Sequence, residues 1–478
     1  PSSAASDVYK RQVNMSRPGD FYNFWPKTAL TFTATDNIDV SCSSEYPAIV
    51  YDGIQVNTGL ILFTKNQQFM LTTDSDILSP QTVKINAMST YNFNFNTNPI
   101  SLGTTIGFLD NAGKNTRFFE MTAAQREGQP DIIEQTKIVS KLFPKGIDLV
   151  ANSRENSVIF FGEKGQSTIY GYRYFQSVEK RIQNAWFKWT LSGNIQHLAM
   201  LDDALYAVIK NGNGKNVVQK FAIKLEDSSN MLVNDLRTSD TDDDIEYRIH
   251  LDNAVLIPHT SLTYDDTPGN KFTWFTLPAG FNNDTGQLAV ILLPTGSDNT
   301  LQGMSQKVYK YFDLNSPNTR IKMSGNWKTY DPQGASDGSL LDDVTPTGNL
   351  VLGYLYDMEV KLPTIYLQKE AAANTWRSET HSSLVVHRVK FSFGPLGVYE
   401  TVIDRVGRPT YTELHESVMA DAYNANQVQF TPDSKKTVPI YEKNTNLTLT
   451  LKSSHPSPAT LVSMTWEGDF NPKYYRRV

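Results

Sequence analysis

Acidic side chains offer the clearest candidates for chemistry in this sequence. The stretch from residue 240 to residue 246 spaces its carboxylates like the start of a helix-loop-helix calcium loop. Counted from Asp240, however, the sixth position is Ile245 instead of Gly and the twelfth is Leu251 instead of Glu, so the motif fails. We interpret the stretch as a solvated linker between domains. Its acidic residues are Asp240, Asp242, Asp243, Asp244 and Glu246.

Two other short motifs resemble parts of catalytic or ligand-binding sites. Asp202 and Asp203 could form half of a glycosidase carboxylate pair, but they directly precede a strand-like run, where Asp favours turns. The Gly212–Lys215 segment resembles a phosphate-binding loop, yet it lacks the spacer and the Ser or Thr after the lysine. We interpret both motifs as turns.

Histidine and cysteine add no metal or nucleophile pattern. His381 and His387 are the closest-spaced histidines, and no metal motif uses their spacing. Cys42 is the single cysteine, so neither a disulfide framework nor a cysteine-rich metal site can form within the chain. We therefore expect a protein that is not an enzyme and that holds no cofactor and no metal.

Composition limits the class of protein further. The 478 residues carry 44 Lys and Arg against 50 Asp and Glu, so there is no basic surplus to neutralise nucleic-acid phosphates. No apolar run approaches the roughly 18 residues of a membrane span, so we expect no membrane-spanning segment. Aromatic residues reach 11% and stand in short segments punctuated by 28 Gly and 23 Pro. Since aromatic residues suit pleated surfaces, the sequence predicts an all-β protein.

Four hairpin-like units recur in the first half of the chain. Each combines an apolar run, a turn of polar residues in which Gly and Asn can supply a positive φ, and a returning run. The runs begin at residues 60, 106, 158 and 205, in steps of 46, 52 and 47 residues. This spacing favours β-propeller blades, and a β-sandwich with coincidental hairpins is the alternative. The hairpins span residues 60–71, 106–119, 158–170 and 205–221.

The segment Trp186–Leu191 indicates how one blade packs. Phe187, Trp189 and Leu191 alternate with Lys188 and Thr190, so the apolar side chains share one face of a strand. Such a stripe is more often core between blades than a platform for sugars. We expect this face to lie between neighbouring sheets.

The rhythm of the strands changes after about residue 231. We expect residues 1–16 to be a leader that is not native together with the start of a fragment. Residues 17–238 are predicted to form propeller blades, 239–370 a second β domain with long loops, and 371–478 a C-terminal β region. Glu370–Asn374 is interpreted as either a short helix or a loop.

Several segments, in order along the chain, resemble the nozzle protein family of short-tailed bacteriophages, also called tail tubular protein B. That family usually has Asp-Pro where this chain has Asp36-Asn37. Each segment alone is a weak signal, whereas the ordered set is fairly specific. The segments are Arg17–Trp25, Asp36–Asp39, Leu60–Leu71, Gln183–Trp189, Asp203–Tyr206, Gly353–Tyr356, Gly394–Gly397 and Trp466–Phe470.

This resemblance implies a fold, a location and a set of partners. It implies a β-propeller with additional β domains in the tail of the virion, assembled as a hexameric ring below a tail adaptor protein. The ring would extend the channel for double-stranded DNA without reading its sequence, support tail fibres and gate genome ejection. Family members are longer, so we expect this chain to be the C-terminal part of such a protein.

A gate and two rival functions follow from these expectations. We expect the acidic stretch 240–246, or the turn-rich loops between residues 260 and 345, to reach the channel and help to close it. One rival is a tail depolymerase that cleaves polysaccharide with carboxylates on a β scaffold. The other is a propeller of non-viral origin that serves as an interaction scaffold. Release of reducing ends from capsule would identify the depolymerase.

Overall fold

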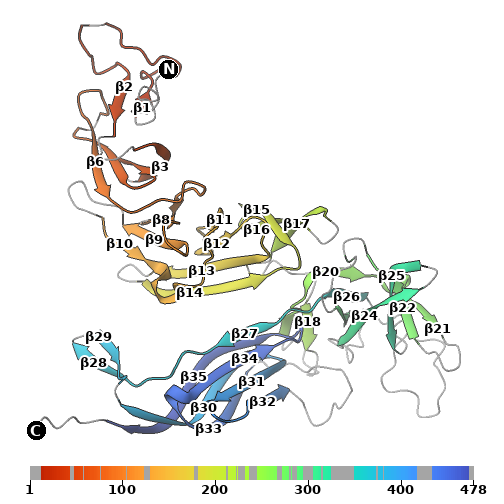
Figure 1. The fold of residues 1–478 in the computed structure, drawn as a ribbon. Coiled ribbons are helices and arrows are strands. Elements are labelled where there is room, and N and C mark those ends of the chain that lie inside the picture. Colours follow the sequence, from red (N-terminus) through yellow and green to blue (C-terminus); the bar gives the residue numbers. More distant parts are fainter. Residues whose placement is uncertain are drawn as a thin grey trace, which may run out of the picture. The chain divides into compact units, whose positions relative to one another are not determined.

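In the computed structural model, the regular secondary structure of the described residues is almost entirely β-strand, which confirms the predicted all-β class (Figure 1). Short 3-10 helices occur at η1 (Gln135–Val139), η4 (His259–Ser261) and η5 (Asn444–Asn446). The chain divides into two compact units, residues 1–225 and residues 226–478. The structure describes every residue except 1–11, 29, 43–47, 57–58, 76, 104, 123–129, 177–180, 211–213, 222, 224–231, 236–244, 266–271, 279–280, 282–287, 294–304, 314–315, 325–348, 373–374, 381, 417–432 and 473–478.

Unit 1 consists of a short hairpin followed by four antiparallel sheets in chain order. The hairpin pairs β1 (Gln12–Met15) with β2 (Ile38–Ser41). In each sheet, sequential strands are neighbours, so every sheet is a simple meander. The four sheets are β3 (Val50–Val56), β4 (Gly59–Thr64), β5 (Gln68–Thr73) and β6 (Val83–Ser89); β7 (Ile100–Ser101), β8 (Thr105–Asp110), β9 (Arg117–Thr122) and β10 (Ile132–Glu134); β11 (Leu149–Ser153), β12 (Val158–Gly162), β13 (Thr168–Gln176) and β14 (Arg181–Thr190); and β15 (Asn194–Leu201), β16 (Ala204–Lys210) and β17 (Asn216–Phe221).

All four predicted hairpins are confirmed. They are the pairs β4–β5, β8–β9, β12–β13 and β16–β17. Gly165, in the turn between β12 and β13, has φ +87°, a conformation that glycine adopts without a steric penalty. Asp202 and Asp203 also have positive φ in the turn before β16, which confirms their interpretation as turn residues.

The central strands of the first three sheets are apolar on both faces because each of these sheets packs between two neighbours. On β4, Ile61 and Phe63 join a cluster with Phe108 of the second sheet. Leu62, between them, points to the other face and joins a cluster with Val13 of the first hairpin. Successive side chains on a strand alternate in direction, so two buried faces require a continuous apolar run. Residues 60–63 are therefore all apolar because both faces of β4 are buried.

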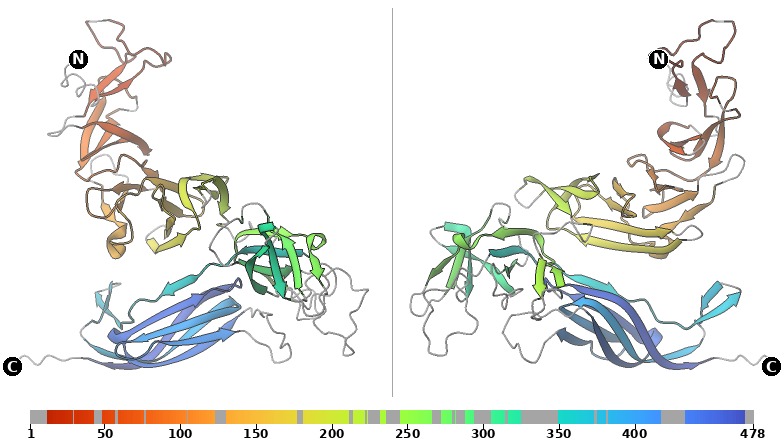
Figure 2. Two further views of the ribbon diagram at one scale, coloured as in Figure 1. Left: turned by 45° about the vertical axis from the view of Figure 1, so that its right-hand side comes forward. Right: turned by 180° about the vertical axis from the view of Figure 1, so that it is seen from behind.

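The same alternation of side chains links the later sheets, whose strands can be followed in Figure 2. Phe118 of β9 packs with Phe161 and Tyr172 of the third sheet. Phe187 and Trp189 pack in the cluster that joins the third and fourth sheets, with Leu191 just beyond β14. The prediction that these alternating residues lie between sheets is confirmed.

Unit 2 begins with a hairpin and a large sheet. The hairpin pairs β18 (Leu232–Asp235) with β19 (Ile245–Arg248). The sheet encloses a cluster that includes Phe275, Phe281 and Leu352. In spatial order its strands are β20 (Asp252–Ile257), β26 (Asn349–Tyr354), β23 (Leu288–Leu293), β24 (Ser305–Asp313), β25 (Ser316–Ser324), β22 (Phe272–Thr276) and β21 (Thr263–Asp265).

The last part of unit 2 is a pair of sheets packed face to face. Phe391 of one sheet, with Tyr399 and Leu451 of the other, belongs to a single buried cluster. The long strands of the second sheet run side by side in Figure 1. The two sheets are β27 (Met358–Lys361), β34 (Leu447–Ser453), β31 (Val398–Arg405) and β32 (Tyr411–Glu416); and β33 (Ser434–Lys443), β30 (Ser383–Leu396) and β35 (Ala459–Asn471).

The segment interpreted as a helix or a loop is instead largely a strand. β28 (Gln368–Ala372) pairs with β29 (Thr375–Ser378), and residues 373–374 of the segment lie outside the described residues. A run of alanines favours a helix locally. Pairing with the neighbouring strand overrides that local preference here.

Candidate functional site

The loop between β1 and β2 carries the most exposed aromatic residues among the described part of the chain. Tyr22 is 95% exposed and Trp25 is 78% exposed. An isolated exposed apolar residue is ordinary, whereas a group of large ones indicates a contact surface. We call residues 17–36 the aromatic loop. Its exposed large apolar residues are Phe21, Tyr22, Phe24, Trp25, Leu30 and Phe32.

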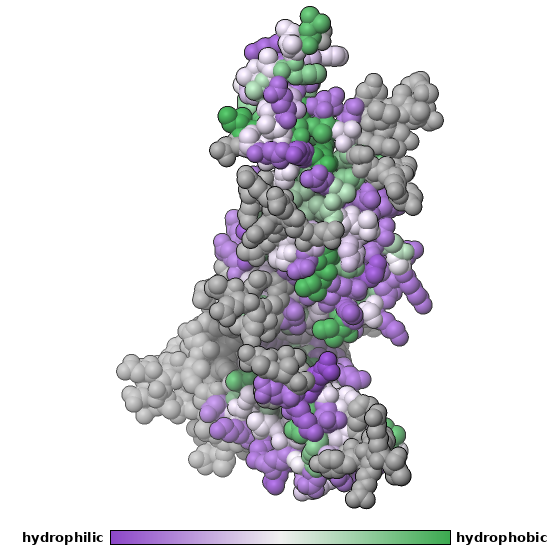
Figure 3. Space-filling view, turned by 90° about the vertical axis from the view of Figure 1, so that its left-hand side faces the viewer, coloured by the Kyte–Doolittle hydropathy of each residue, from purple (hydrophilic) through white to green (hydrophobic). Residues whose placement is uncertain are grey.

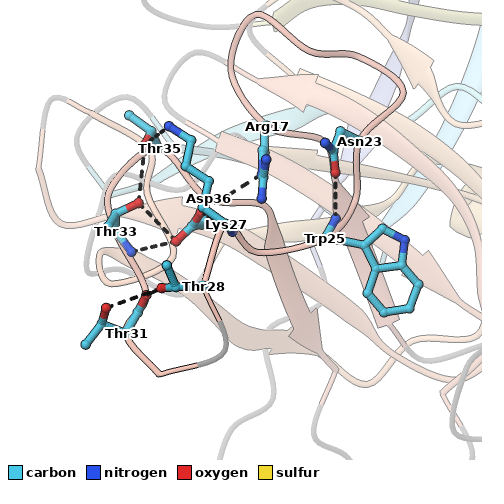
Figure 4. A network of polar contacts seen from close by, with 9 residues as sticks. All are labelled: Arg17, Asn23, Trp25, Lys27, Thr28, Thr31, Thr33, Thr35 and Asp36. Carbon is cyan, nitrogen blue, oxygen red and sulfur yellow. Dashed lines mark hydrogen bonds and ion pairs between the residues drawn. The ribbon is translucent and has the colours of Figure 1, made fainter.

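Asp36 holds the second part of this loop in place (Figure 4). Its carboxylate accepts hydrogen bonds from the backbone N–H groups of Thr33, at 2.7 Å, and Lys27, at 2.9 Å. It also accepts a hydrogen bond from the Thr33 hydroxyl, at 3.0 Å, and Arg17 Nε lies 4.0 Å from Oδ1. Thus one buried carboxylate orders the chain on both sides of the aromatic residues.

These contacts also determine the charge of Asp36. The hydrogen bonds from the backbone of Thr33 and Lys27 lower the pKa of the Asp36 carboxyl below its ordinary value, and the Arg17 guanidinium adds to this effect. The charged form accepts these hydrogen bonds best. The group is therefore ionised at neutral pH, where the loop is most stable.

Backbone contacts fold the first part of the aromatic loop. Asp20 N–H donates to Arg17 O at 3.1 Å, and Arg17 N–H donates to Asn23 O at 3.0 Å. Gly19 takes φ +79°, which favours glycine at this turn. The Asn23 side chain accepts from Trp25 N–H at 3.1 Å. The aromatic side chains are consequently presented on an organised loop.

A pocket of about 450 Å³ lies where the first strands of the second, third and fourth sheets come together. Its wall includes Asp148, Asn152, Arg154 and His197. Asn152 donates to Ser101 O at 3.0 Å, and Asp148 Oδ1 accepts from Lys164 N–H at 2.8 Å. These bonds join strands and turns, so Asn152 and Asp148 have structural roles.

The predicted gate residues fall largely outside the described part of the chain. Asp240, Asp242, Asp243 and Asp244 lie outside it. Glu246 lies in β19, where its backbone pairs opposite Asn234. The loops expected to reach the channel between residues 260 and 345 are also largely outside the described residues.

The other predicted motifs have structural surroundings where they are described. Asp203 Oδ1 accepts hydrogen bonds from Ser153 Oγ, at 2.6 Å, and Asn156 Nδ2, at 2.8 Å. Gly214 takes φ +75° between β16 and β17, as expected for a turn. His387 Nε2 lies 3.2 Å from Asp469 Oδ2, and His381 is outside the described residues.

Two features escaped the sequence reasoning. The aromatic loop was predictable from its six large apolar residues in a segment that lacks strand alternation. Residues Gly334–Gly338 have the Gly-x-Ser-x-Gly spacing of a nucleophile elbow, which requires a turn from strand to helix. This segment lies outside the described residues.

Metal sites and membrane-spanning helices are both absent from the described residues. Within them, no three His, Cys, Asp or Glu side chains are grouped so as to hold a metal ion. Among the same residues, no helix is long and apolar enough to cross a membrane.

Comparison with known proteins adds a family and one distant relative. The family model described as "Bacteriophage nozzle protein" matches residues 11–477. Tail tubular protein gp12 of Escherichia phage T7 is 24% identical over 203 residues. That match covers 42% of this chain and 25% of the relative, so it spans about a quarter of the relative's length.

Similarity to solved structures is weak. A luciferin-regenerating enzyme matches with a TM-score of 0.25 and 10% identity, over 61% of this chain and 81% of that protein. An exo-β-1,3-galactanase from Phanerochaete chrysosporium matches with a TM-score of 0.18 and 8% identity, over 84% and 76%. TM-scores at this level carry no argument about fold or function.

Proposed function

The chain belongs to the bacteriophage nozzle protein family, and from this premise we propose that it is a subunit of the ring that ends the tail channel. As a family member it is a structural protein of the virion tail. The observation that carries the proposal is the family match over residues 11–477, which is nearly the whole chain. In the proposed assembly, copies of the chain form a hexameric ring below a tail adaptor protein, and the ring supports the tail fibres.

Charge supports a passive role toward DNA. The formal net charge is -6 at pH 7. Each phosphate contact in a DNA complex strengthens binding by releasing counterions, and a conduit must release DNA as readily as it admits it. An acidic chain suits such a wall because it repels the phosphates. We propose that double-stranded DNA passes through the ring without sequence-specific contacts.

The four meander sheets of unit 1 support the proposal that they are propeller blades. Each sheet packs against the next through an apolar cluster, as propeller blades do. We further propose that the acidic stretch from Asp240 to Glu246, with the loops between residues 260 and 345, narrows the channel until ejection. A structure of the assembled ring with all of these loops on its outer surface would overturn the gate.

Electron microscopy of the purified chain with its adaptor tests the main proposal. We expect rings with a central pore, because a nozzle must surround the DNA. Light scattering on the same mixture measures the mass of the assembly. A chain that stays monomeric at micromolar concentration beside the purified adaptor contradicts the proposed function.

A further inference from the structure

The first strands of the four sheets in unit 1 share a position in their sheets. β3, β7, β11 and β15 each lie at the edge of a sheet and pair with one neighbour there. The pocket of about 450 Å³ lies against three of these strands, β7, β11 and β15. Small-molecule sites have volumes of about 300–1,000 Å³, so this pocket is large enough for a ligand. We call it the first-strand pocket.

The wall of the first-strand pocket combines apolar side chains with polar groups of both signs. Leu149 and Leu198 supply apolar surface, and the amide of Asn98 both donates and accepts hydrogen bonds. Arg154 supplies a cation, and among the described residues of the wall Asp148 is the single acid. A ligand that suits this wall has apolar surface, groups that donate and accept, and no net charge.

Backbone geometry brings Arg154 and His197 to the pocket. Arg154 follows β11, yet its guanidinium reaches the second sheet, since a Cβ at Gly103 would lie 3.7 Å from Nη2. On β15 the register shifts between Ile195 and His197. Ile195 and Leu198 are both buried, whereas His197 is exposed. In a regular strand His197 would share the face of Ile195, so the bulge directs it away from the core.

An exposed pair of aromatic rings adjoins the pocket. Hydrophobic side chains reach the surface over the N-terminal part of unit 1, at the top of Figure 3. Tyr51, 42% exposed, and Phe95, 45% exposed, stack with ring centroids 4.8 Å apart and planes at 21°. The register of β3 shifts at Tyr51, which leaves this residue outside the ladder with β4. Phe95 directly precedes Asn96, which is part of the pocket wall.

We propose that this surface binds a neutral oligosaccharide, with one sugar ring in the first-strand pocket and a neighbouring ring against Phe95. A sugar ring carries C–H groups on its faces, which pack on aromatic and aliphatic side chains. Its hydroxyls both donate and accept, so one uncharged ring can bond to Arg154 and to Asp148. An anionic ligand would be repelled by Asp148, and a cationic ligand by Arg154.

The chemistry of the wall indicates binding without cleavage. Glycosidases use a pair of carboxyl groups on opposite sides of the scissile bond. In the described wall Asp148 has no acidic partner, and one of its oxygens accepts from Lys164 N–H. The inference therefore goes beyond the nozzle role as a recognition function, and it does not depend on assembly of the ring.

Titration of the full chain with defined sugars tests the proposal. The neutral probes are the hexaoses of glucose and of mannose, and the acidic probe is a hexamer of galacturonate. Saturation-transfer NMR detects binding, and calorimetry gives the Kd. We expect a neutral hexaose to bind at least tenfold more tightly than the acidic one, because Asp148 disfavours negative charge. No reducing ends should be released.

Substitutions locate the site and test its charge selectivity. Phe95→Ala and Arg154→Gln should each raise the Kd for the neutral hexaose at least tenfold. Asp148→Asn keeps an oxygen for Lys164 N–H and should narrow the difference between neutral and acidic probes at least threefold. Tyr411→Ala is the matched control, because Tyr411 is 49% exposed in unit 2 and should leave the Kd unchanged. Circular dichroism should be the same for all of these chains.

The outcomes separate this proposal from the nozzle role. If neither neutral hexaose binds, or if Phe95→Ala and Arg154→Gln bind as the wild type does, the saccharide site is refuted. Tighter binding of the acidic probe overturns the charge argument and the ligand class with it. Rings that assemble on the adaptor beside such a result leave the nozzle role intact. A chain that binds the neutral probe but forms no ring supports the saccharide site and contradicts the nozzle role.

Discussion

Replacing Phe118 with Ala should separate two sheets of unit 1 that otherwise stabilise each other. The Phe118 side chain is fully buried, and its ring centroid lies 5.2 Å from Phe161, 5.6 Å from Tyr172 and 6.2 Å from Trp186. All three partners belong to the third sheet, whereas Phe118 belongs to the second. Removing the ring therefore leaves a cavity between the sheets.

The loss of stability in Phe118→Ala follows from the burial of the ring and from the lack of another side chain to fill the cavity. A Phe→Ala change in a core destabilises a protein by about 3–5 kcal/mol. The ring also covers Gly107 on the neighbouring strand β8, where a Cβ would lie 2.7 Å from two ring carbons, so this side of the cavity has no side chain to fill the space. We expect about 4 kcal/mol, which corresponds to a roughly thousandfold change in an opening equilibrium.

Hydrogen exchange measured by mass spectrometry can localise this loss in the full chain. Amides of β8 and β9 in the second sheet, and of β12 and β13 in the third, should exchange up to a thousandfold faster where they exchange through sub-global opening. Unit 2 should be unchanged. The matched control, Phe391→Ala in the core of unit 2, should show the reverse pattern.

One result would refute the reasoning. If Phe118→Ala accelerates exchange only in the second sheet, then the aromatic cluster does not couple the two sheets. The stack would then be a row of independent hairpins, and the argument for blades would lose its physical basis.

Three further outcomes are expected. Burial lowers the pKa of His455 to about 4, and its Nδ1 accepts from Ser457 N–H, so folding favours the neutral ring. This contribution to stability is complete above the unfolded pKa near 6.5 and is lost as pH falls to about 4, by on the order of 3 kcal/mol. Thermal melts should therefore show a lower melting temperature at pH 5 than at pH 7. His455→Gln should reduce this difference between the two pH values. Gly468→Ala should destabilise unit 2 by about 1–3 kcal/mol in the same melts, because the new Cβ would lie 2.2 Å from Val385 O. Burial raises the pKa of the Cys42 thiol, so a disulfide reagent should label it only after unfolding in urea.

The hairpins of unit 1 were predictable because their signals are local. An apolar run, a turn of polar residues with Gly or Asn, and a returning run require only neighbouring residues to pair. The alternation of Phe187 and Trp189 likewise follows from the period of a strand. The predicted division at residues 238 and 370 stays a prediction, and so does the interpretation of the sheets as propeller blades.

The candidate site was less accessible to sequence reasoning. The acidic stretch drew attention because carboxylates carry chemistry, but its role stays a proposal. The aromatic loop was noticed only as a family signal, because its exposure depends on what the rest of the chain fails to cover. Glu370 and its neighbours show a related limit, since strand pairing replaced a local helical preference.

By itself, the sequence determined that the chain is all-β, that hairpins recur every 46 to 52 residues, and that the chain resembles phage nozzle proteins. These properties depend on local periodicity, turn chemistry and ordered motifs. Only the tertiary structure decided which face of each strand meets which neighbour, and that the residues around Trp25 stay exposed on a loop held by Asp36. Burial is a property of contacts between distant segments, so no local pattern can specify it.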